Sequence, residues 1–225
     1  MASGDEGSVA IAFFDVDKTI LAVNSSSGWL KREVRGGHIG HRDALRVVFW
    51  LALYNAGFSG LERVIVDQSR KMRGVRESSI VERAERFWLE EVRYLIRDGA
   101  RAAIERHRER GDEIVLLTTA PSYLTASVAA EVGATAYLCN RLEVEDGAFT
   151  GRMQLPMCYG AGKVAHADEY ARKVGVALAD CSFYTDSYSD LPMLAVVGSP
   201  VAVHPDRRLR RHAQQRGWPI EEWVT

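Results

Sequence analysis

Four short apolar runs, bounded by polar or turn residues, constrain the fold of this chain more than any other feature. The runs are Val9–Phe14, Ile114–Leu117, Cys181–Tyr184 and Val201–Val203. A short unbroken run of this kind is typical of a strand buried on both faces, as in a parallel sheet. Asp15, Thr118 and Asp186 stand at or just after the ends of three of these runs. In open parallel sheets, ligands bind beyond the carboxyl ends of the strands, so this placement indicates a site there.

Helical patterns that end at glycine lie between the later runs. These patterns are Arg101–Arg110 before Gly111, Tyr123–Val132 before Gly133, and Lys163–Val174 before Gly175. A glycine just after a helix is a common C-terminal cap. Strands that alternate with capped helices indicate βαβ units. We therefore expect an α/β fold whose core is a Rossmann-like parallel sheet.

Residues 24–97 break this alternation. The segment contains helical patterns at Ala44–Phe58 and Ser79–Arg97, and no strand-like run separates them. We expect a helical cap domain at 24–97, inserted after the first strand, and a core domain built from 1–23 and 98–225. A shorter segment, Arg141–Gln154, alternates apolar residues around Asp146-Gly147, a dipeptide that favours a hairpin turn.

Composition narrows the class of protein. The 225 residues are 47% hydrophobic and 26% charged, with a formal net charge of −1, which excludes a disordered chain and predicts no nucleic-acid partner. The basic stretch Arg207–Arg216 is interpreted as a solvated helix face. Three scattered cysteines predict neither a disulfide framework nor a zinc site, and favour a reducing cytoplasm. The longest apolar run, Val47–Tyr54, is too short for a membrane span, and no signal peptide is evident.

Two carboxylates, Asp15 and Asp17, lie two residues apart in FFDVDKTIL. On a tight turn they could converge on Mg²⁺, which prefers oxygen ligands. One could instead attack phosphorus as a nucleophile while its neighbour acts as general acid and base. The alternative is a purely structural role, in which the strand has a polar end and Thr19 caps a helix. The motif alone does not decide between these interpretations.

Hydroxyl and ammonium groups follow at the next junctions. Thr118 and Thr119 could donate to phosphate oxygens, or the same pair could simply cap the following helix. Lys163 opens a helix after two glycines, where its charge could meet a phosphate, or it could be a solvated surface lysine.

Asp186 and Asp190 form an acidic i, i+4 pair in YTDSYSDLPML. Such a pair repels itself unless a cation lies nearby, so a metal is the economical explanation. A loop aspartate followed by a helix-capping aspartate is the alternative. These bland alternatives do not explain why all four features occur in one chain, in this order, at expected strand ends or loop-to-helix junctions.

The four motifs resemble those of the haloacid dehalogenase-like phosphohydrolases. FFDVDKTIL looks like the first motif, VLLTTAPSYL the second, CYGAGKV the third and TDSYSDLPML the fourth. The resemblance extends over nearly the whole chain, from Ala12 to Trp218. It is to the subgroup, subfamily IB, that carries a helical cap after the first motif and includes the phosphoserine phosphatases.

The resemblance implies a role for each matching residue. Asp15 would attack the phosphorus and become phosphorylated, and Asp17 would act as general acid and base. Phosphate-binding residues would be Thr118, Thr119, Lys163 and Ser189. Mg²⁺ would be the cofactor, with Asp15, Asp17 through its main-chain carbonyl, Asp186 and Asp190 in or around the metal site. The substrate would be a small-molecule phosphomonoester.

One position departs from the phosphoserine phosphatases. Where they carry a glutamate that holds the substrate's ammonium group, this chain has Asn24, which makes L-phosphoserine a doubtful substrate. We expect a cytoplasmic Mg²⁺-dependent phosphatase, monomeric or homodimeric, that works through an aspartyl-phosphate. A phosphotransferase with the same chemistry and a non-catalytic phosphate-binding regulatory module are the alternatives.

Overall fold

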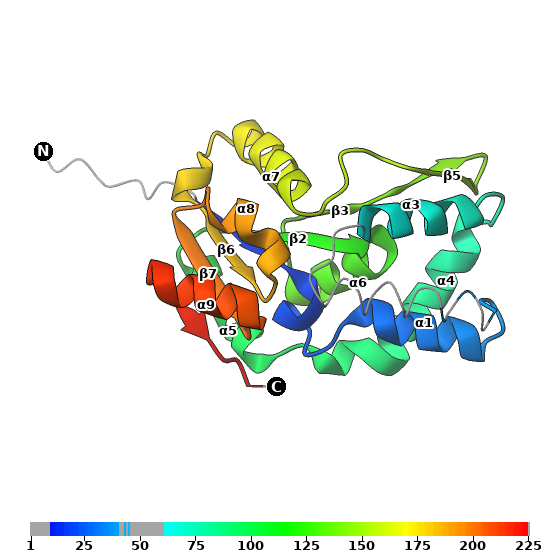
Figure 1. The fold of residues 1–225 in the computed structure, drawn as a ribbon, viewed down its shortest axis with the longest axis horizontal. Coiled ribbons are helices and arrows are strands. Elements are labelled where there is room, and N and C mark those ends of the chain that lie inside the picture. The colour runs from blue at the N-terminus through cyan, green and yellow to red at the C-terminus, as the bar shows by residue number, and fades with distance from the viewer. Residues whose placement is uncertain (1–9, 41–42, 44, 46–60, 225) are drawn as a thin grey trace, which may run out of the picture.

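The structure, a computed structural model, describes residues 10–40, 43, 45 and 61–224 of the chain. The helix expected at Ala44–Phe58 lies outside these residues, except for Leu45. Figure 1 shows a sheet flanked by helices at one end of the molecule and further helices at the other end.

A six-stranded parallel sheet forms the core, in the order β3-β2-β1-β6-β7-β8. Its strands are β1 (Ile11–Phe14), β2 (Glu113–Pro121), β3 (Ala136–Asn140), β6 (Ser182–Thr185), β7 (Ser199–Val203) and β8 (Ile220–Glu221). All four strands expected from the apolar runs are present, and the expected α/β fold is confirmed. β3 and β8 do not correspond to any of the four apolar runs.

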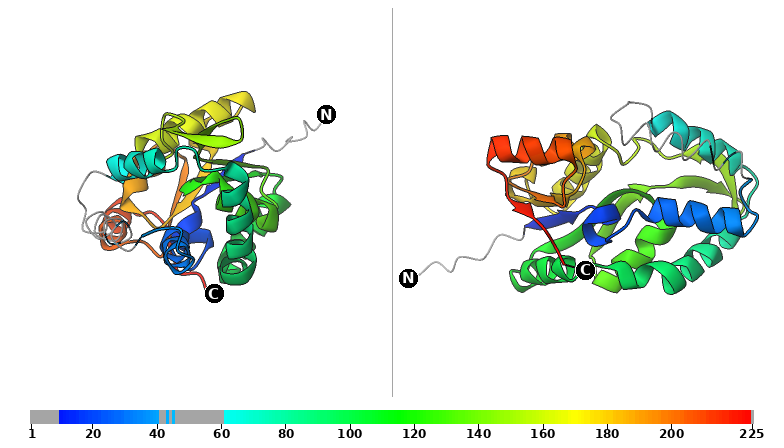
Figure 2. Two further views of the ribbon diagram at one scale, coloured as in Figure 1. Left: turned by 90° about the vertical axis from the view of Figure 1, so that its right-hand side faces the viewer. Right: turned by 60° about the horizontal axis from the view of Figure 1, so that its bottom comes forward.

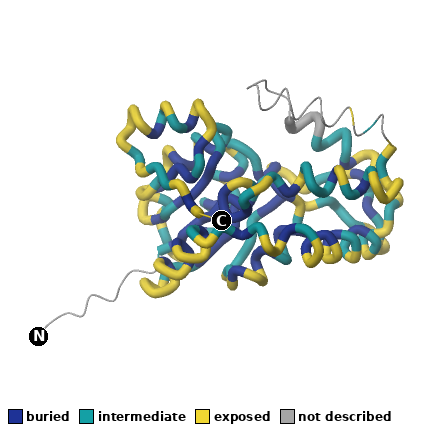
Figure 3. The backbone as a smooth tube through the Cα atoms, turned by 90° about the horizontal axis from the view of Figure 1, so that it is seen from below, coloured by how far each residue is buried: buried dark blue, intermediate teal, exposed yellow. Residues whose placement is uncertain are grey.

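Helices cover both faces of this sheet, as Figure 2 shows from two further sides. One face packs against α5 (Asp98–Glu109) and α6 (Ser122–Val132), and the other against α7 (Ala161–Lys173), α8 (Leu191–Leu194) and α9 (Arg207–Arg216). Along β1, Ala12 and Phe14 belong to the core on the α5 and α6 side, whereas Ile11 and Phe13 belong to the core on the α7, α8 and α9 side. Because successive side chains of a strand point to opposite faces, a wholly apolar run is needed here. The tube in Figure 3 is accordingly buried through the sheet and exposed along the outer turns of the helices.

The other end of the molecule contains α1 (Ser25–Arg35), α3 (Leu61–Lys71) and α4 (Glu77–Phe87). After Phe87 the chain continues as the π-turn η2 (Trp88–Val92) and the 3₁₀ turn η3 (Arg93–Leu95). The sequence pattern predicts one helix over Ser79–Arg97, so the structure differs in the winding of its second half. The buried residues Phe87, Trp88 and Val92 continue one apolar stripe through the change, and periodicity therefore does not reveal it.

Two linkers join the helical end to the sheet, and they pair with each other. Leu21 and Ile96 form an antiparallel bridge, beside which Ala22 N–H donates to Leu95 O (2.8 Å). These crossings lie close to residues 24 and 97, where the domain boundaries are predicted. Those boundaries stay a prediction.

A hairpin from the second half of the chain reaches the helical end. β4 (Leu142–Glu145) and β5 (Ala148–Met153) pair antiparallel, and the turn at Asp146-Gly147 has positive φ at both residues, as expected. Gly74 N–H donates to Phe149 O (2.8 Å), and Phe149 N–H donates to Val75 O (2.9 Å). The hairpin is therefore hydrogen-bonded to the segment between α3 and α4.

No helix within the described ranges combines the length and apolar character that crossing a bilayer requires.

Candidate active site

The carboxyl ends of the central strands bring the expected site residues to one edge of the sheet. β1 lies between β2 and β6, with Phe14 opposite both Leu116 and Tyr184. Asp15 therefore leaves the sheet beside the strand ends that carry Thr118 and Thr185, and its N–H donates to Tyr184 O (2.9 Å). Strand register alone thus places the first, second and fourth motifs side by side.

Lys163, at the start of α7, lies in the middle of this cluster. It is only 1% exposed. Its Nζ donates to Asp15 Oδ1 (2.9 Å) and to Asp190 Oδ2 (2.7 Å), and Thr185 Oγ1 donates to the same Asp190 oxygen (2.6 Å). The interpretation of Lys163 as a solvated surface side chain is therefore wrong. A buried ammonium needs paired charges of this kind, because unpaired burial is costly.

Burial and mutual charge shift the pKa values of these groups. Burial raises the pKa of Asp15 to about 6, even though the Lys163 ammonium acts to lower it. Burial alone would lower the pKa of Lys163, but the charges of Asp15 and Asp190 hold it above its ordinary value. Lys163 therefore stays a cation at neutral pH, beside a carboxylate that is ionised at that pH.

The turn after β1 fixes Asp17. η1 (Val16–Ile20) is a distorted single turn in which Lys18 adopts a left-handed conformation (φ 59°) and is exposed. Lys18 N–H donates to Val23 O (3.0 Å), and Ser25 N–H donates to Asp17 Oδ1 (2.8 Å). Burial raises the pKa of Asp17, partly offset by the hydrogen bonds from Ser25. A carboxyl group with a raised pKa can carry a proton to a leaving group and take one from water.

Asp186, like Asp15 and Asp190, is a buried carboxyl group of the cluster. Burial raises its pKa well above the usual value, and the charge of Asp15 raises it further. Two carboxylates that destabilise each other in this way favour a divalent cation between them. Together with the main-chain carbonyl of Asp17 they could provide an all-oxygen donor set of the kind that suits Mg²⁺, which keeps several water ligands.

The acidic residues do not form a cluster of protein ligands by themselves. Within residues 10–40, 43, 45 and 61–224, no three His, Cys, Asp or Glu side chains converge as a metal-binding group. Asp190 contacts Lys163 and Thr185, and Asp17 accepts from the backbone of Ser25. The side chains thus fit a site with few protein ligands, and Asp190 is held by Lys163 and Thr185.

The expected phosphate-binding residues lie around the same edge. Thr118 is buried at the end of the β2 core, and its Oγ1 accepts from Ala120 N–H (3.2 Å). Thr119 Oγ1 donates its proton to Cys158 O (3.0 Å), so this hydroxyl joins the end of β2 to the loop before α7. Ser189, on η5 (Tyr188–Asp190), exchanges a hydrogen bond with Ser187 (Oγ–Oγ 2.9 Å).

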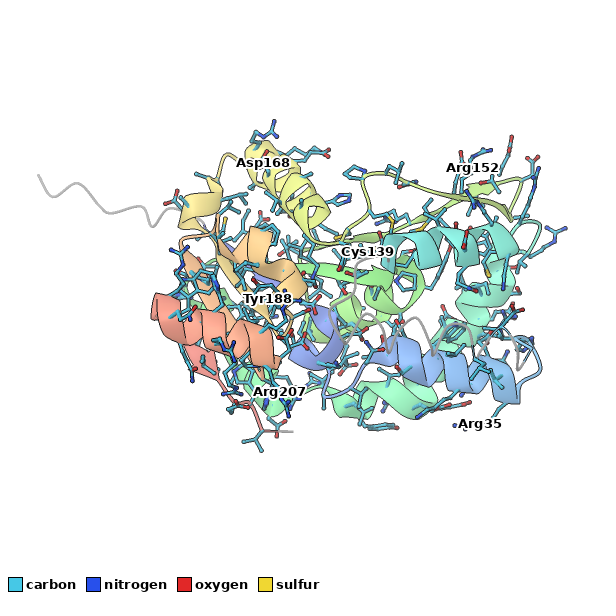
Figure 4. The ribbon with its side chains drawn as sticks, in the orientation of Figure 1. Arg35, Cys139, Arg152, Asp168, Tyr188 and Arg207 are labelled. Carbon is cyan, nitrogen blue, oxygen red and sulfur yellow. The ribbon has the colours of Figure 1, made fainter. Side chains whose placement is uncertain are left out.

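The loop that carries Ser189 is held from outside the site. Tyr188 N–H donates to Asp206 Oδ2 (2.7 Å), the residue that caps α9. Figure 4 labels Tyr188 and, at the start of α9, Arg207. The last helix therefore helps to position the fourth motif.

Two further residues shape the site and were missed. Gly162 lies so close to Met157 that an added Cβ would stand 1.8 Å from its carbonyl oxygen, which explains the glycine before Lys163. Asn140 is buried at the end of β3 and bonds to the second and third motifs. The glycine-rich spacing of the third motif offered a signal for Gly162, whereas Asn140 ends a strand that the apolar runs did not reveal.

Comparison with known proteins agrees with this geometry. The family model described as haloacid dehalogenase-like hydrolase matches residues 12–195. The chain is 35% identical over 213 residues to the "Inhibition of morphological differentiation protein" of Streptomyces azureus, covering 93% of this chain and 76% of that relative. It is 32% identical over 218 residues to "Phosphoserine phosphatase SerB1" of Mycobacterium tuberculosis, covering 95% of this chain and 71% of that relative.

Solved structures share the fold. A protein of unknown function from Bordetella pertussis Tohama I superimposes with a TM-score of 0.85 at 28% identity, over 95% of this chain and 98% of its own. A phosphoserine phosphatase solved as a phospho-aspartyl intermediate analogue gives a TM-score of 0.72 at 18% identity, over 96% and 95% of the two chains. With four motifs meeting at the carboxyl edge of this sheet and a family model that covers most of the sequence, the chain belongs to the haloacid dehalogenase-like hydrolase family.

Proposed function

We propose that this protein is a Mg²⁺-dependent phosphatase that hydrolyses a small phosphomonoester through an aspartyl-phosphate on Asp15. The chain is a phosphoric monoester hydrolase of the haloacid dehalogenase-like type. One observation carries the finer proposal: a buried Lys163 ammonium bonds both Asp15 and Asp190 at the carboxyl edge of a parallel sheet.

In the first step, an Asp15 carboxylate oxygen attacks the phosphorus, and the bond from phosphorus to the ester oxygen breaks. Lys163 holds its charge beside the attacking group, where it can neutralise the phosphoryl oxygens. Thr118 lies beside Asp15 at the neighbouring strand end and is the second candidate contact for these oxygens. Phosphoryl transfer depends mainly on such positioning and charge neutralisation.

Asp17 moves the protons. Its raised pKa suits donation to the departing ester oxygen, and the resulting carboxylate can then take a proton from the water that attacks the aspartyl-phosphate. Asp15, Asp186 and the carbonyl of Asp17 would hold Mg²⁺, which when bound lowers the repulsion between an anionic nucleophile and an anionic substrate.

We further propose that residues 24–97 act as the cap domain that selects the leaving group, with residues 1–23 and 98–225 as the core. Asn24 Oδ1 accepts from Ser27 N–H (3.0 Å) and Ser27 Oγ (3.1 Å), so this amide serves as the N-cap of α1. It offers no negative charge to an ammonium group, which argues against L-phosphoserine even though one relative is named for it. The substrate we propose is a small phosphomonoester, met in the cytoplasm by a monomer or homodimer.

The test is phosphate release from a panel of metabolite phosphomonoesters that includes L-phosphoserine, with Mg²⁺ and with EDTA. Asp15→Asn is the inactive variant, and Lys173→Met, an exposed change on the same helix as Lys163, is the matched control. We expect turnover that needs both Mg²⁺ and Asp15. Turnover that survives in EDTA or in Asp15→Asn would overturn the mechanism, and absence of release from folded, Mg²⁺-loaded protein would overturn the phosphatase assignment.

A further inference from the structure

Asn140 is a buried polar residue with no part in the chemistry described above. It ends β3 and is 5% exposed. Figure 4 labels Cys139, the residue before Asn140 in β3. Its side chain therefore lies in the interior, next to the segments that carry the second and third motifs.

Both ends of the Asn140 amide are used, and each contacts a different motif. Nδ2 donates to Thr119 O (2.7 Å), and Oδ1 accepts from Cys158 N–H (2.9 Å). A second tie runs parallel, because Thr119 Oγ1 donates to Cys158 O (3.0 Å). The end of β2 and the loop before α7 are thus joined through one side chain and one hydroxyl.

The loop that begins at Cys158 leads directly to Lys163, so these hydrogen bonds bear on the position of Lys163. From Cys158 the chain turns tightly, with Gly162 N–H donating to Tyr159 O (2.9 Å) and Lys163 N–H to Gly160 O (3.2 Å). Gly162 packs directly on the Met157 carbonyl, which leaves no room for a Cβ at this position of the turn. The position of the Cys158 backbone therefore fixes where α7 begins and where Lys163 projects.

We propose that Asn140 is a positioning residue for catalysis: it sets the distance between Thr118, on the second motif, and Lys163, on the third. The proposal rests on the proposed phosphatase function, in which these two groups bind the phosphoryl oxygens. Asparagine suits the role because the tie needs a donor for a carbonyl and an acceptor for an N–H on one short side chain. Aspartate keeps only the acceptor, and leucine, of similar size, keeps neither.

The experiment compares Asn140→Leu and Asn140→Asp with wild-type protein. Tyr170→Phe is the matched control. It removes a partly buried hydrogen bond between α7 and β2, from Tyr170 Oη to Glu113 (2.7 Å), that does not involve Lys163. Each folded variant is assayed with two phosphomonoesters that differ in leaving group, and its affinity for inorganic phosphate is measured by calorimetry with Mg²⁺ present.

In both Asn140 variants we expect kcat/KM to fall by the same factor for the two substrates, roughly 10- to 100-fold. Phosphate affinity should fall with it, and the Cys158 N–H should lose its protection from hydrogen exchange. Tyr170→Phe should change none of these. A side chain that only stabilises the fold would lower thermal stability and leave phosphate affinity and kcat/KM in the folded protein unchanged.

Unequal losses for the two leaving groups, or unchanged phosphate affinity in either folded Asn140 variant, would overturn the proposal. If wild-type protein releases no phosphate from any ester, the proposed function fails. Phosphate affinity and Cys158 exchange still decide separately whether Asn140 holds the two motifs together, because neither measurement needs turnover.

Discussion

At the scale of single residues, the site depends on one buried cation shared by two carboxylates. Lys163 bonds Asp15 and Asp190, and Thr185 fixes the oxygen of Asp190 that Lys163 contacts. Removing one member of such a buried set leaves the others uncompensated. The same three charges therefore bear on the stability of this edge of the sheet, and we propose that they also set its affinity for phosphate.

Lys163→Met should lower kcat by on the order of 100-fold or more, because a preorganised donor to the transferring group is lost. Steady-state kinetics on the best substrate measure this. Lys163→Arg keeps the charge but does not reproduce the compact ammonium, so it should not restore full activity. Lys173→Met, on the exposed side of the same helix, should behave like wild type. Near-normal kcat in folded Lys163→Met would remove Lys163 from the mechanism.

The sequence predicted some of these residues for clear physical reasons. Asp15 and Asp186 follow apolar strands, and register forces such residues together. It predicted Lys163 only through the glycines before it, and did not show that its charge is buried. Asn140 escaped because its importance lies in two backbone contacts, which no local pattern records.

At the scale of elements, short caps and turns determine where the site residues point. Asn24 caps the start of α1 by accepting from Ser27, and the preceding turn brings Ser25 N–H to Asp17. The start of α1 thus also holds Asp17, the proposed general acid and base, in place.

Asn24→Ala should lower the free energy of unfolding by about 1 kcal/mol, because the N-cap oxygen is lost. Asn24→Asp keeps the capping oxygen and should stay close to wild type. Urea denaturation of the three proteins tests this. Equal stability of Asn24→Ala and wild type would mean that the cap contributes nothing to folding.

Elements with strong periodicity were predictable, and those shaped by their neighbours were not. β1 and the stretch Ile114–Leu117 of β2 are wholly apolar because helices cover both faces. β3 lies at the edge of the sheet and is only half buried along Ala136–Leu138, and its short run Ala136–Cys139 was not predicted as a strand. The change from α4 to η2 stayed hidden, because its buried stripe continues without a break.

At the scale of the whole molecule, the helical end is joined to the sheet at several places. The two linkers bridge at Leu21 and Ile96, the β4–β5 hairpin bonds the segment after α3, and α4 packs against α6. Any movement that admits substrate must therefore carry the hairpin along or break its hydrogen bonds. A single hinge between two bodies does not describe these contacts.

The free energy of unfolding should depend on pH through His107, a buried residue of α5. His107 contacts Tyr184 Oη (2.9 Å) and Asp112 (2.7 Å), and burial lowers its pKa below the ordinary 6.5. The unfolded chain then binds more protons just below pH 6.5, so this contribution to stability is present above that pH and is lost as pH falls. The free energy of unfolding, measured by urea denaturation between pH 5 and about 7.5, should rise less steeply with pH in His107→Gln than in wild-type protein. An unchanged dependence of the unfolding free energy on pH would show that His107 does not contribute to it.

The central claim is that Asp15 carries the phosphoryl group, and trapping it is the most direct test. Asp17→Asn is mixed with para-nitrophenyl phosphate and Mg²⁺, quenched in acid, and its peptides are analysed by mass spectrometry. This leaving group needs no proton from an acid, whereas hydrolysis of the intermediate needs a base. The account predicts that phosphate accumulates on the peptide that contains Asp15 and that Asp15→Asn abolishes the label. Nitrophenol release that requires Asp15 but leaves no phosphoryl group on it, or a label on another residue, would contradict the account.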